Sequence, residues 1–218
     1  MQIEIFSDVV CPWCFIGKRR LDKTLQAADL QETDISLRWR PYQLHANLPD
    51  AGVDRLDYLQ QRYGPDADPG RIPERIRAEA EDEGIELRFD LIKRTPNTLL
   101  AHRLLEFAVP HDKQHELAEA LFIAYFCQGK DVGKRDVLVE VAAGVGLDSA
   151  AAAEFLSSDA GTAEVQQQLA RAPELGVSGV PGYYIANAFL LPGAQTSEVM
   201  GQIINRVRER IESGAIAN

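Results

Sequence analysis

Cysteine is scarce in this chain of 218 residues, which contains only Cys11, Cys14 and Cys127. Three cysteines are too few for the disulfide framework that holds small secreted domains together. A structural zinc site usually draws on four Cys or His ligands, often as two close pairs, and no second C-x-x-C pair follows the first. The sequence therefore predicts no metal site.

Basic residues and long apolar runs are also in short supply. The chain has 23 Lys and Arg against 33 Asp and Glu, a formal net charge of -10, whereas phosphate binding needs clustered Lys and Arg. No apolar run approaches the roughly 18 residues that a membrane-spanning helix needs. The first residues show neither the basic nor the apolar segment of a secretory signal. We therefore expect no nucleic-acid partner, no membrane partner and a cytoplasmic location.

Hydrophobic periodicity predicts an ordered succession of elements. Alternating polar and apolar residues indicate strands, and apolar residues at intervals of three and four indicate helices. The chain is expected to begin with a strand, a helix and a strand and to end with two short strands and a helix. The expected ranges are 2–7, 11–28, 34–42, 182–185, 189–191 and 197–212.

The pattern between these two ends is mostly helical. The order βαβ, helices, then ββα resembles the thioredoxin scaffold with helices inserted between its halves. We therefore predict an α/β fold of the thioredoxin-like class with an all-helical insertion. Residues 1–50 and 161–218 are expected to form the thioredoxin-like domain, and residues 51–160 the helical insertion domain.

The chemistry is expected at Cys11 and Cys14, which enclose Pro12 and Trp13. A C-x-x-C pair is a weak signal alone, but one that follows a strand and opens a helix is typical of redox-active thiols. Unpaired N–H groups and the helix dipole stabilise a thiolate at such a position. We expect Cys11 to be the exposed, attacking thiol and Cys14, one turn later, to be the more buried resolving thiol. Pro12 and Trp13 would constrain the loop and shield one side of the sulfurs.

Four other features of the sequence carry weaker expectations. Val180-Pro181 precedes a predicted strand, and local sequence alone favours a trans bond there. His102, on a predicted helix, is a candidate to line a substrate cleft. Cys127 is expected to be a small buried side chain at the end of an apolar helix. Glu4 and Arg40 are expected to pair on the solvent face of adjacent strands.

Taken together, these motifs resemble one family over nearly the whole chain. The matching segments are 8–18, 38–44, 95–98, 101–103, 124–126, 176–181 and 193–195. They are similar to the FrnE-type branch of the DsbA family, with Cys-Pro-Trp-Cys and Gly-Val-Pro as the most specific parts. This resemblance implies a cytoplasmic protein-disulfide oxidoreductase or isomerase without a bound cofactor. It further implies a cis bond at Val180-Pro181, whose backbone would pair with an extended substrate.

Two alternatives stay open at this stage. Kappa-type glutathione transferases and 2-hydroxychromene-2-carboxylate isomerases look similar, but they use a serine where this chain has Cys11. On that reading the partner would be glutathione, which is also a potential co-substrate for disulfide exchange. The second alternative is a redox-inert binding module or chaperone. The sequence leaves undecided whether the substrate is a protein or a small thiol, and whether the chain is a monomer or a homodimer.

Overall fold

The structure is a computed structural model that describes residues 1–27 and 35–216. The chain begins with strand β1 (Gln2–Ser7), helix α1 (Pro12–Ala27) and strand β2 (Ser36–Pro41). These elements confirm the predicted βαβ unit. The last residue of the predicted helix, Ala28, and the first of the predicted second strand, Asp34, lie outside the described residues.

One sheet gathers strands from both ends of the chain in the order β2-β1-β5-β6. β1 runs parallel to β2 and antiparallel to β5 (Gly182–Ile185), which forms a hairpin with β6 (Phe189–Pro192). Ile5 of β1 lies opposite Trp39 on one side and Tyr183 on the other. The predicted late strand pair is therefore confirmed, and it brings the segment after Pro181 beside the start of α1.

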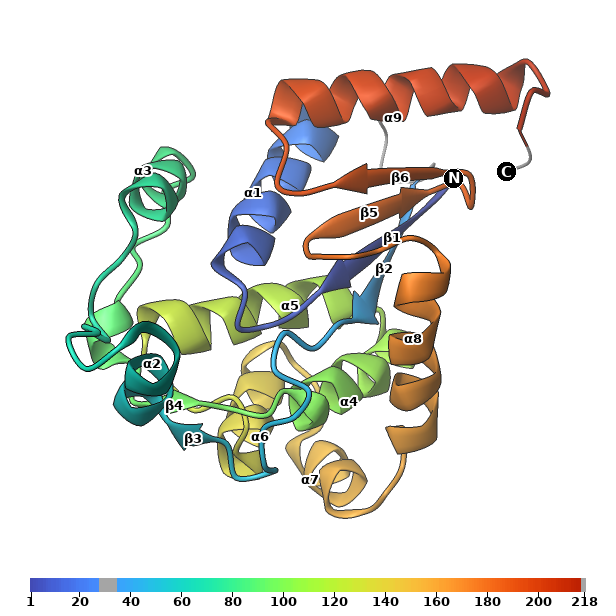
Figure 1. The fold of residues 1–218 in the computed structure, drawn as a ribbon. Helices are drawn as coiled ribbons and strands as arrows, with labels where there is room; N and C mark the ends of the chain where they lie inside the picture. Colours follow the sequence, from blue (N-terminus) through green and yellow to red (C-terminus); the bar gives the residue numbers. More distant parts are fainter. Residues whose placement is uncertain (28–34, 217–218) are drawn as a thin grey trace.

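Helices cover both faces of this sheet (Figure 1). α1 packs against α9 (Ser197–Glu212), the predicted final helix, and its residues Phe15 and Ile16 share a core with Ile3 and Ile5. On the other face, Phe6 packs with residues of and after helix α8 (Thr162–Glu174). β1 is buried on both faces because helices lie above and below it.

The region between β2 and α8 is helical apart from one short pairing of β3 (Val53–Asp54) with β4 (Arg94–Thr95). Its helices are α2 (Arg55–Tyr63), α3 (Glu74–Asp82), α4 (Leu99–Phe107), α5 (Gln114–Phe122), α6 (Arg135–Gly144) and α7 (Ser149–Ser157). Two 3-10 turns (Phe89–Leu91 and Val109–His111) and a π-helical turn (Ile123–Cys127) complete it. The domain boundaries at residues 50 and 160 stay a prediction. No helix in the described ranges is both long enough and apolar enough to cross a membrane.

Candidate active site

The two thiols lie just after the end of β1, at the start of α1. Cys11 directly precedes α1, and its N–H donates to the Asp8 carbonyl oxygen at 3.0 Å. The Cys14 N–H in turn donates to the Cys11 carbonyl oxygen at 3.0 Å. Pro12 suits the first helical position because it has no N–H to leave unpaired there. The sequence prediction of a C-x-x-C pair at a helix start is therefore confirmed.

Cys11 is less accessible than the sequence predicted. Both cysteines are in the thiol form, and the exposed fractions of Cys11 and Cys14 are 4% and 1%. The expectation of an exposed Cys11 is wrong because a distant loop covers it: its Sγ lies 3.7 Å from the Val180 carbonyl oxygen. Burial raises the pKa of Cys14 well above its ordinary value, and the neighbouring Cys11 raises it further. The order of burial still makes Cys14 the deeper thiol.

The covering loop ends in a cis peptide bond between Val180 and Pro181. The Gly193 N–H donates to the Pro181 carbonyl oxygen at 2.7 Å and so ties this loop to the end of β6. Val180 is half-buried, whereas Pro181 is buried. A cavity of about 260 Å³ opens along the loop between residues 176 and 182. This loop and the Cys11–Cys14 turn therefore face one another across the Cys11 sulfur.

The intervening residues of the motif border the thiols on their outer side. Pro12 and Trp13 are both half-buried, so each keeps part of its side chain at the surface. The guanidinium of Arg75, from α3, lies 5.3 Å from the centre of the Trp13 ring, a cation–π geometry. Helix α3 thus forms the rim of the site next to Trp13, and no local pattern in the sequence predicts this contact.

His102 lies behind the site rather than in a surface cleft. It is 2% exposed, and its Nε2 donates to the Tyr42 carbonyl oxygen at 3.0 Å. The same Nε2 is 3.5 Å from Oδ1 of the buried Asp8, whose Oδ2 accepts from the Leu44 N–H at 2.8 Å. The prediction that His102 lines a substrate cleft is therefore wrong in this structure, because the inner face of α4 turns it towards Asp8.

Three further residues next to the thiols were missed by sequence reasoning. Ser7 and Asp8 are buried, and among the described residues the Ser7 hydroxyl has no hydrogen-bond partner. Tyr183 is buried, and among the described residues its hydroxyl has no hydrogen-bond partner. Burial raises the pKa of Tyr183 well above its ordinary value. Ser7 ends the predicted strand just before the motif, which is the only signal that could have marked it.

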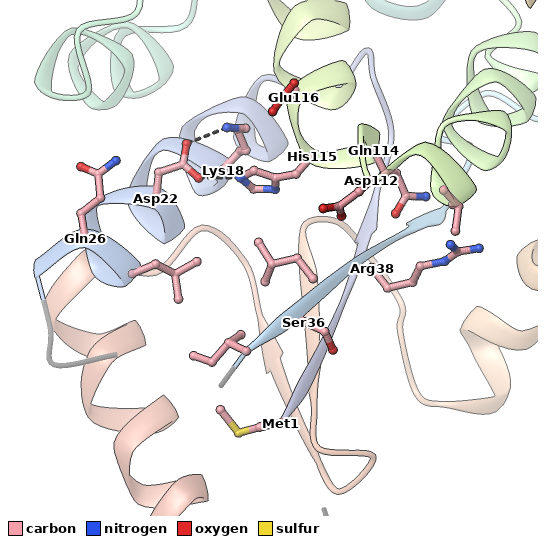
Figure 2. A pocket seen from close by; sticks show the side chains of 14 residues that line it. Met1, Lys18, Asp22, Gln26, Ser36, Arg38, Asp112, Gln114, His115 and Glu116 are labelled. Atoms are coloured by element: carbon pink, nitrogen blue, oxygen red, sulfur yellow. Dashed lines mark hydrogen bonds and ion pairs between the residues drawn. The ribbon is translucent and has the colours of Figure 1, made fainter. Parts of the chain in front are cut away.

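A larger cavity of about 1180 Å³ lies elsewhere, between α1, β2 and α5 (Figure 2). Lys18 and His115 both reach Asp22 there, at 2.6 and 2.7 Å. Trp39 Nε1, which can only donate, bonds His115 Nδ1 at 3.1 Å and so assigns the proton to His115 Nε2. Neither thiol lines this cavity. Within the described residues, no three His, Cys, Asp or Glu side chains are arranged to hold a metal ion.

Two other predictions from the sequence concern residues away from the thiols, and the structure corrects both. Cys127 is half-buried rather than fully buried, and burial raises its pKa. Glu4 is 2% exposed and forms ion pairs with both Arg40 and Arg171. The expectation of a solvent-facing Glu4–Arg40 pair is therefore wrong, because α8 covers that face of the sheet and contributes Arg171.

Comparisons with known proteins agree with this fold. A family model described as DSBA-like thioredoxin domain matches residues 2–205. The uncharacterized protein YwbO of Bacillus subtilis is 28% identical over 206 residues, which cover 94% of this chain and 96% of YwbO. The crystal structure of a probable DsbA oxidoreductase from Streptomyces coelicolor is 28% identical, with a TM-score of 0.81 over 94% of this chain and 89% of that one.

A 2-hydroxychromene-2-carboxylate isomerase shares the fold alone, at 17% identity and a TM-score of 0.69 over all of both chains. The chain therefore has the thioredoxin-like fold of a disulfide oxidoreductase family. It belongs to the DSBA-like thioredoxin domain family.

Proposed function

We propose that this chain is a thiol–disulfide oxidoreductase that works through Cys11 and Cys14. The observation that carries the proposal is the position of the Cys11 sulfur, at the start of α1 and 3.7 Å from the Val180 carbonyl oxygen beside Pro181. A helix N-terminus favours the thiolate form of the attacking cysteine. Membership of a family of DsbA-like proteins supports the same reaction class.

The exchange proceeds in two displacement steps. The Cys11 thiolate attacks one sulfur of a substrate disulfide, so that bond breaks and one substrate sulfur leaves as a thiolate. The Cys14 thiolate then attacks Cys11 Sγ, which forms the Cys11–Cys14 disulfide and releases the second substrate thiolate. Each released thiolate takes up a proton from solvent. Run backwards, the same steps oxidise a substrate dithiol.

The substrate is proposed to lie over Pro12, Trp13 and the Val180-Pro181 loop, since these border the Cys11 sulfur. Because Cys11 is 4% exposed, a protein thiol or a small thiol would reach the Cys11 sulfur only after the Val180-Pro181 loop moves aside. No bound cofactor is required by the two steps, and glutathione enters only as a potential co-substrate. The cytoplasmic location and the oligomeric state stay predictions.

Insulin reduction by dithiothreitol tests this function. We expect the parent protein to accelerate precipitation of the insulin chains and Cys11→Ser to fall to the uncatalysed rate. Cys14→Ser should accumulate a mixed disulfide with the substrate, visible as a mass adduct. Cys127→Ser is the matched control and should retain the parent rate. A Cys11→Ser variant as active as the parent would refute the proposal.

The same set of variants distinguishes the proposed disulfide exchange from the alternative, a glutathione-dependent isomerase. An isomerase that binds glutathione would keep its activity without a redox-active thiol pair. Isomerisation of 2-hydroxychromene-2-carboxylate that survives Cys11→Ser would therefore favour that alternative. The expected result is no isomerisation above background in the parent protein.

A further inference from the structure

Arg75, in the first turn of α3, places a guanidinium at the edge of the active-site turn. The guanidinium lies 5.3 Å from the centre of the Trp13 ring, and Trp13 stands between Pro12 and Cys14. The ring face attracts a cation and so favours this position of the guanidinium. The Arg75 side chain is nevertheless 81% exposed. A positive charge is therefore presented to solvent beside the thiol pair.

The two carboxylates next to Arg75 on α3 leave its charge largely unbalanced. Glu79 is the only ion-pair partner of Arg75 among the described residues, and the distance from Arg75 Nε to Glu79 Oε1 is 3.9 Å. Glu79 forms a closer ion pair with Arg20 of α1. Glu74 pairs with Arg77 at 2.5 Å. Both carboxylates thus bind another arginine more closely, so the Nη donors of Arg75 stay available to a ligand.

The other groups that border the thiols on their outer side are uncharged. The Pro12-Trp13 turn and the Val180-Pro181 loop have no ionisable side chain. Asp8, the carboxylate nearest to the motif in sequence, is 0% exposed. The whole chain has a formal net charge of -10, but at physiological ionic strength exposed charges more than about 8 Å apart are largely screened. Because α3 packs against α1 (Figure 1), a substrate meets the positive charge of Arg75 although the protein as a whole is acidic.

We propose that Arg75 is a specificity-determining residue that binds a carboxylate of the substrate, so that the protein prefers disulfides with an acidic group close to the sulfur. This inference rests on the proposed disulfide exchange and names the substrate class of that site. A guanidinium can rest its face on an aromatic ring and still donate two parallel N–H···O bonds to a carboxylate in its own plane. Two sources supply such a carboxylate: an acidic residue beside the cysteine of a protein substrate, or a small acidic thiol.

Exchange rates with matched peptide disulfides test this preference, in a Cys127→Ser background. The probes are the symmetric disulfides of three acetylated, amidated dipeptides, in which Glu, Gln or Lys precedes the cysteine. Reduced protein is mixed with each probe and quenched with acid, and chromatography then gives the second-order rate constant. We expect the Glu probe to react about twofold to fivefold faster than the Gln probe, the range for one exposed ion pair. The Lys probe should react more slowly than the Gln probe, and salt should reduce both differences.

Ratios of these rate constants separate specificity from structure, because a general change in thiol reactivity alters all three rates equally. Arg75→Gln should bring the Glu-to-Gln ratio close to one, and Arg75→Glu should bring it below one. Arg75→Lys keeps the charge and should retain most of the preference. Arg77→Gln is the matched control, since it changes the net charge of the same helix equally but does not touch Trp13. Its ratio should equal that of the parent protein.

Oxidised glutathione, measured with the same variants, distinguishes the two sources of the carboxylate. A rate that falls in Arg75→Gln, relative to the Gln probe, supports a protein substrate if it is seen with the Glu probe and a small acidic thiol if it is seen only with glutathione. No relative fall with either disulfide overturns the inference alone. An equal fall in Arg77→Gln also overturns it, because net charge would then set the preference. A parent protein that reacts with none of the disulfides contradicts the proposed function, and the inference with it.

Discussion

At the scale of single residues, Gly17 governs how closely α1 approaches β5. A Cβ at this position would overlap the Tyr183 hydroxyl and would lie 3.1 Å from Pro181 Cγ and 3.4 Å from Ala194 Cβ. Helix α1 can therefore lie directly over the strand that follows the cis proline only because residue 17 has no side chain. This contact fixes the distance between the thiols and the Pro181 loop.

Gly17→Ala should destabilise the protein by about 1–3 kcal/mol, the usual cost of overpacking, despite the better helix propensity of alanine. Tyr183→Phe removes the overlapping hydroxyl and should restore most of that loss in the double variant. The Tyr183→Phe variant alone is the control and should be near neutral, because no described residue bonds its hydroxyl. Urea denaturation gives the free energies. A double variant no more stable than Gly17→Ala would show that the overlap is not the cause.

Residue environments were the part of the site that the sequence could not predict. The motif placed Cys11 and Cys14 at a helix start, since that depends on nearby residues alone. Exposure of Cys11 depends on Val180, which lies 169 positions away. His102 and Glu4 were misplaced for the same reason: each is buried by an element that the local pattern does not identify.

At the scale of elements, a buried guanidinium joins three segments around the site. Arg20 of α1 donates through Nε to Glu83 at 2.9 Å and through Nη1 to the Ala194 carbonyl oxygen at 2.8 Å. It also forms an ion pair with Glu79 of α3. This three-way contact holds α3, and hence Arg75 above Trp13, against α1.

Arg20→Met should lower the stability by roughly 3 kcal/mol, because removal of one partner leaves the buried carboxylate of Glu83 and the half-buried carboxylate of Glu79 poorly paired. Lys23, which also contacts Glu83 at 2.6 Å, limits that loss. Hydrogen exchange should accelerate in α3 more than in α5. Arg77→Met removes an exposed pair with Glu74 on the same helix and should cost less than about 1 kcal/mol. Uniform acceleration over all helices would contradict the specific role of Arg20.

Regular elements were predictable where periodicity was strong. The strands β1, β2, β5 and β6 and the helices α1 and α9 follow from alternation and from helical spacing, which depend on local sequence. The β3–β4 pairing was missed because each strand has two residues, too few for a period to show. The π-helical turn at the end of α5 was predicted as ordinary helix, since its apolar residues continue the same spacing.

At the scale of the whole molecule, paired carboxylates connect the sheet and the helices that surround it. Burial raises the pKa of Glu4, Asp22 and Glu83, but in each case ion pairs and hydrogen bonds lower it by more, so each pKa lies below its usual value. Glu4 joins β1 to β2 and α8, Asp22 joins α1 to α5, and Glu83 binds α1. Acid should therefore loosen several layers of the fold together.

The sign of this effect follows from linkage. A carboxylate with a lowered folded-state pKa stabilises the protein fully above its unfolded value, near 4.5 for Glu, and loses that contribution as pH falls through the folded value. Glu4→Gln mimics the protonated form, so it should cost about 3 kcal/mol at neutral pH and progressively less below pH 4.5. Urea denaturation of both proteins across this range measures the difference. Glu140→Gln, in an exposed pair with Lys130, is the control and should follow the parent curve. A Glu4→Gln penalty that stays constant into acid would mean that the Glu4 charge is not what stabilises the sheet against α8.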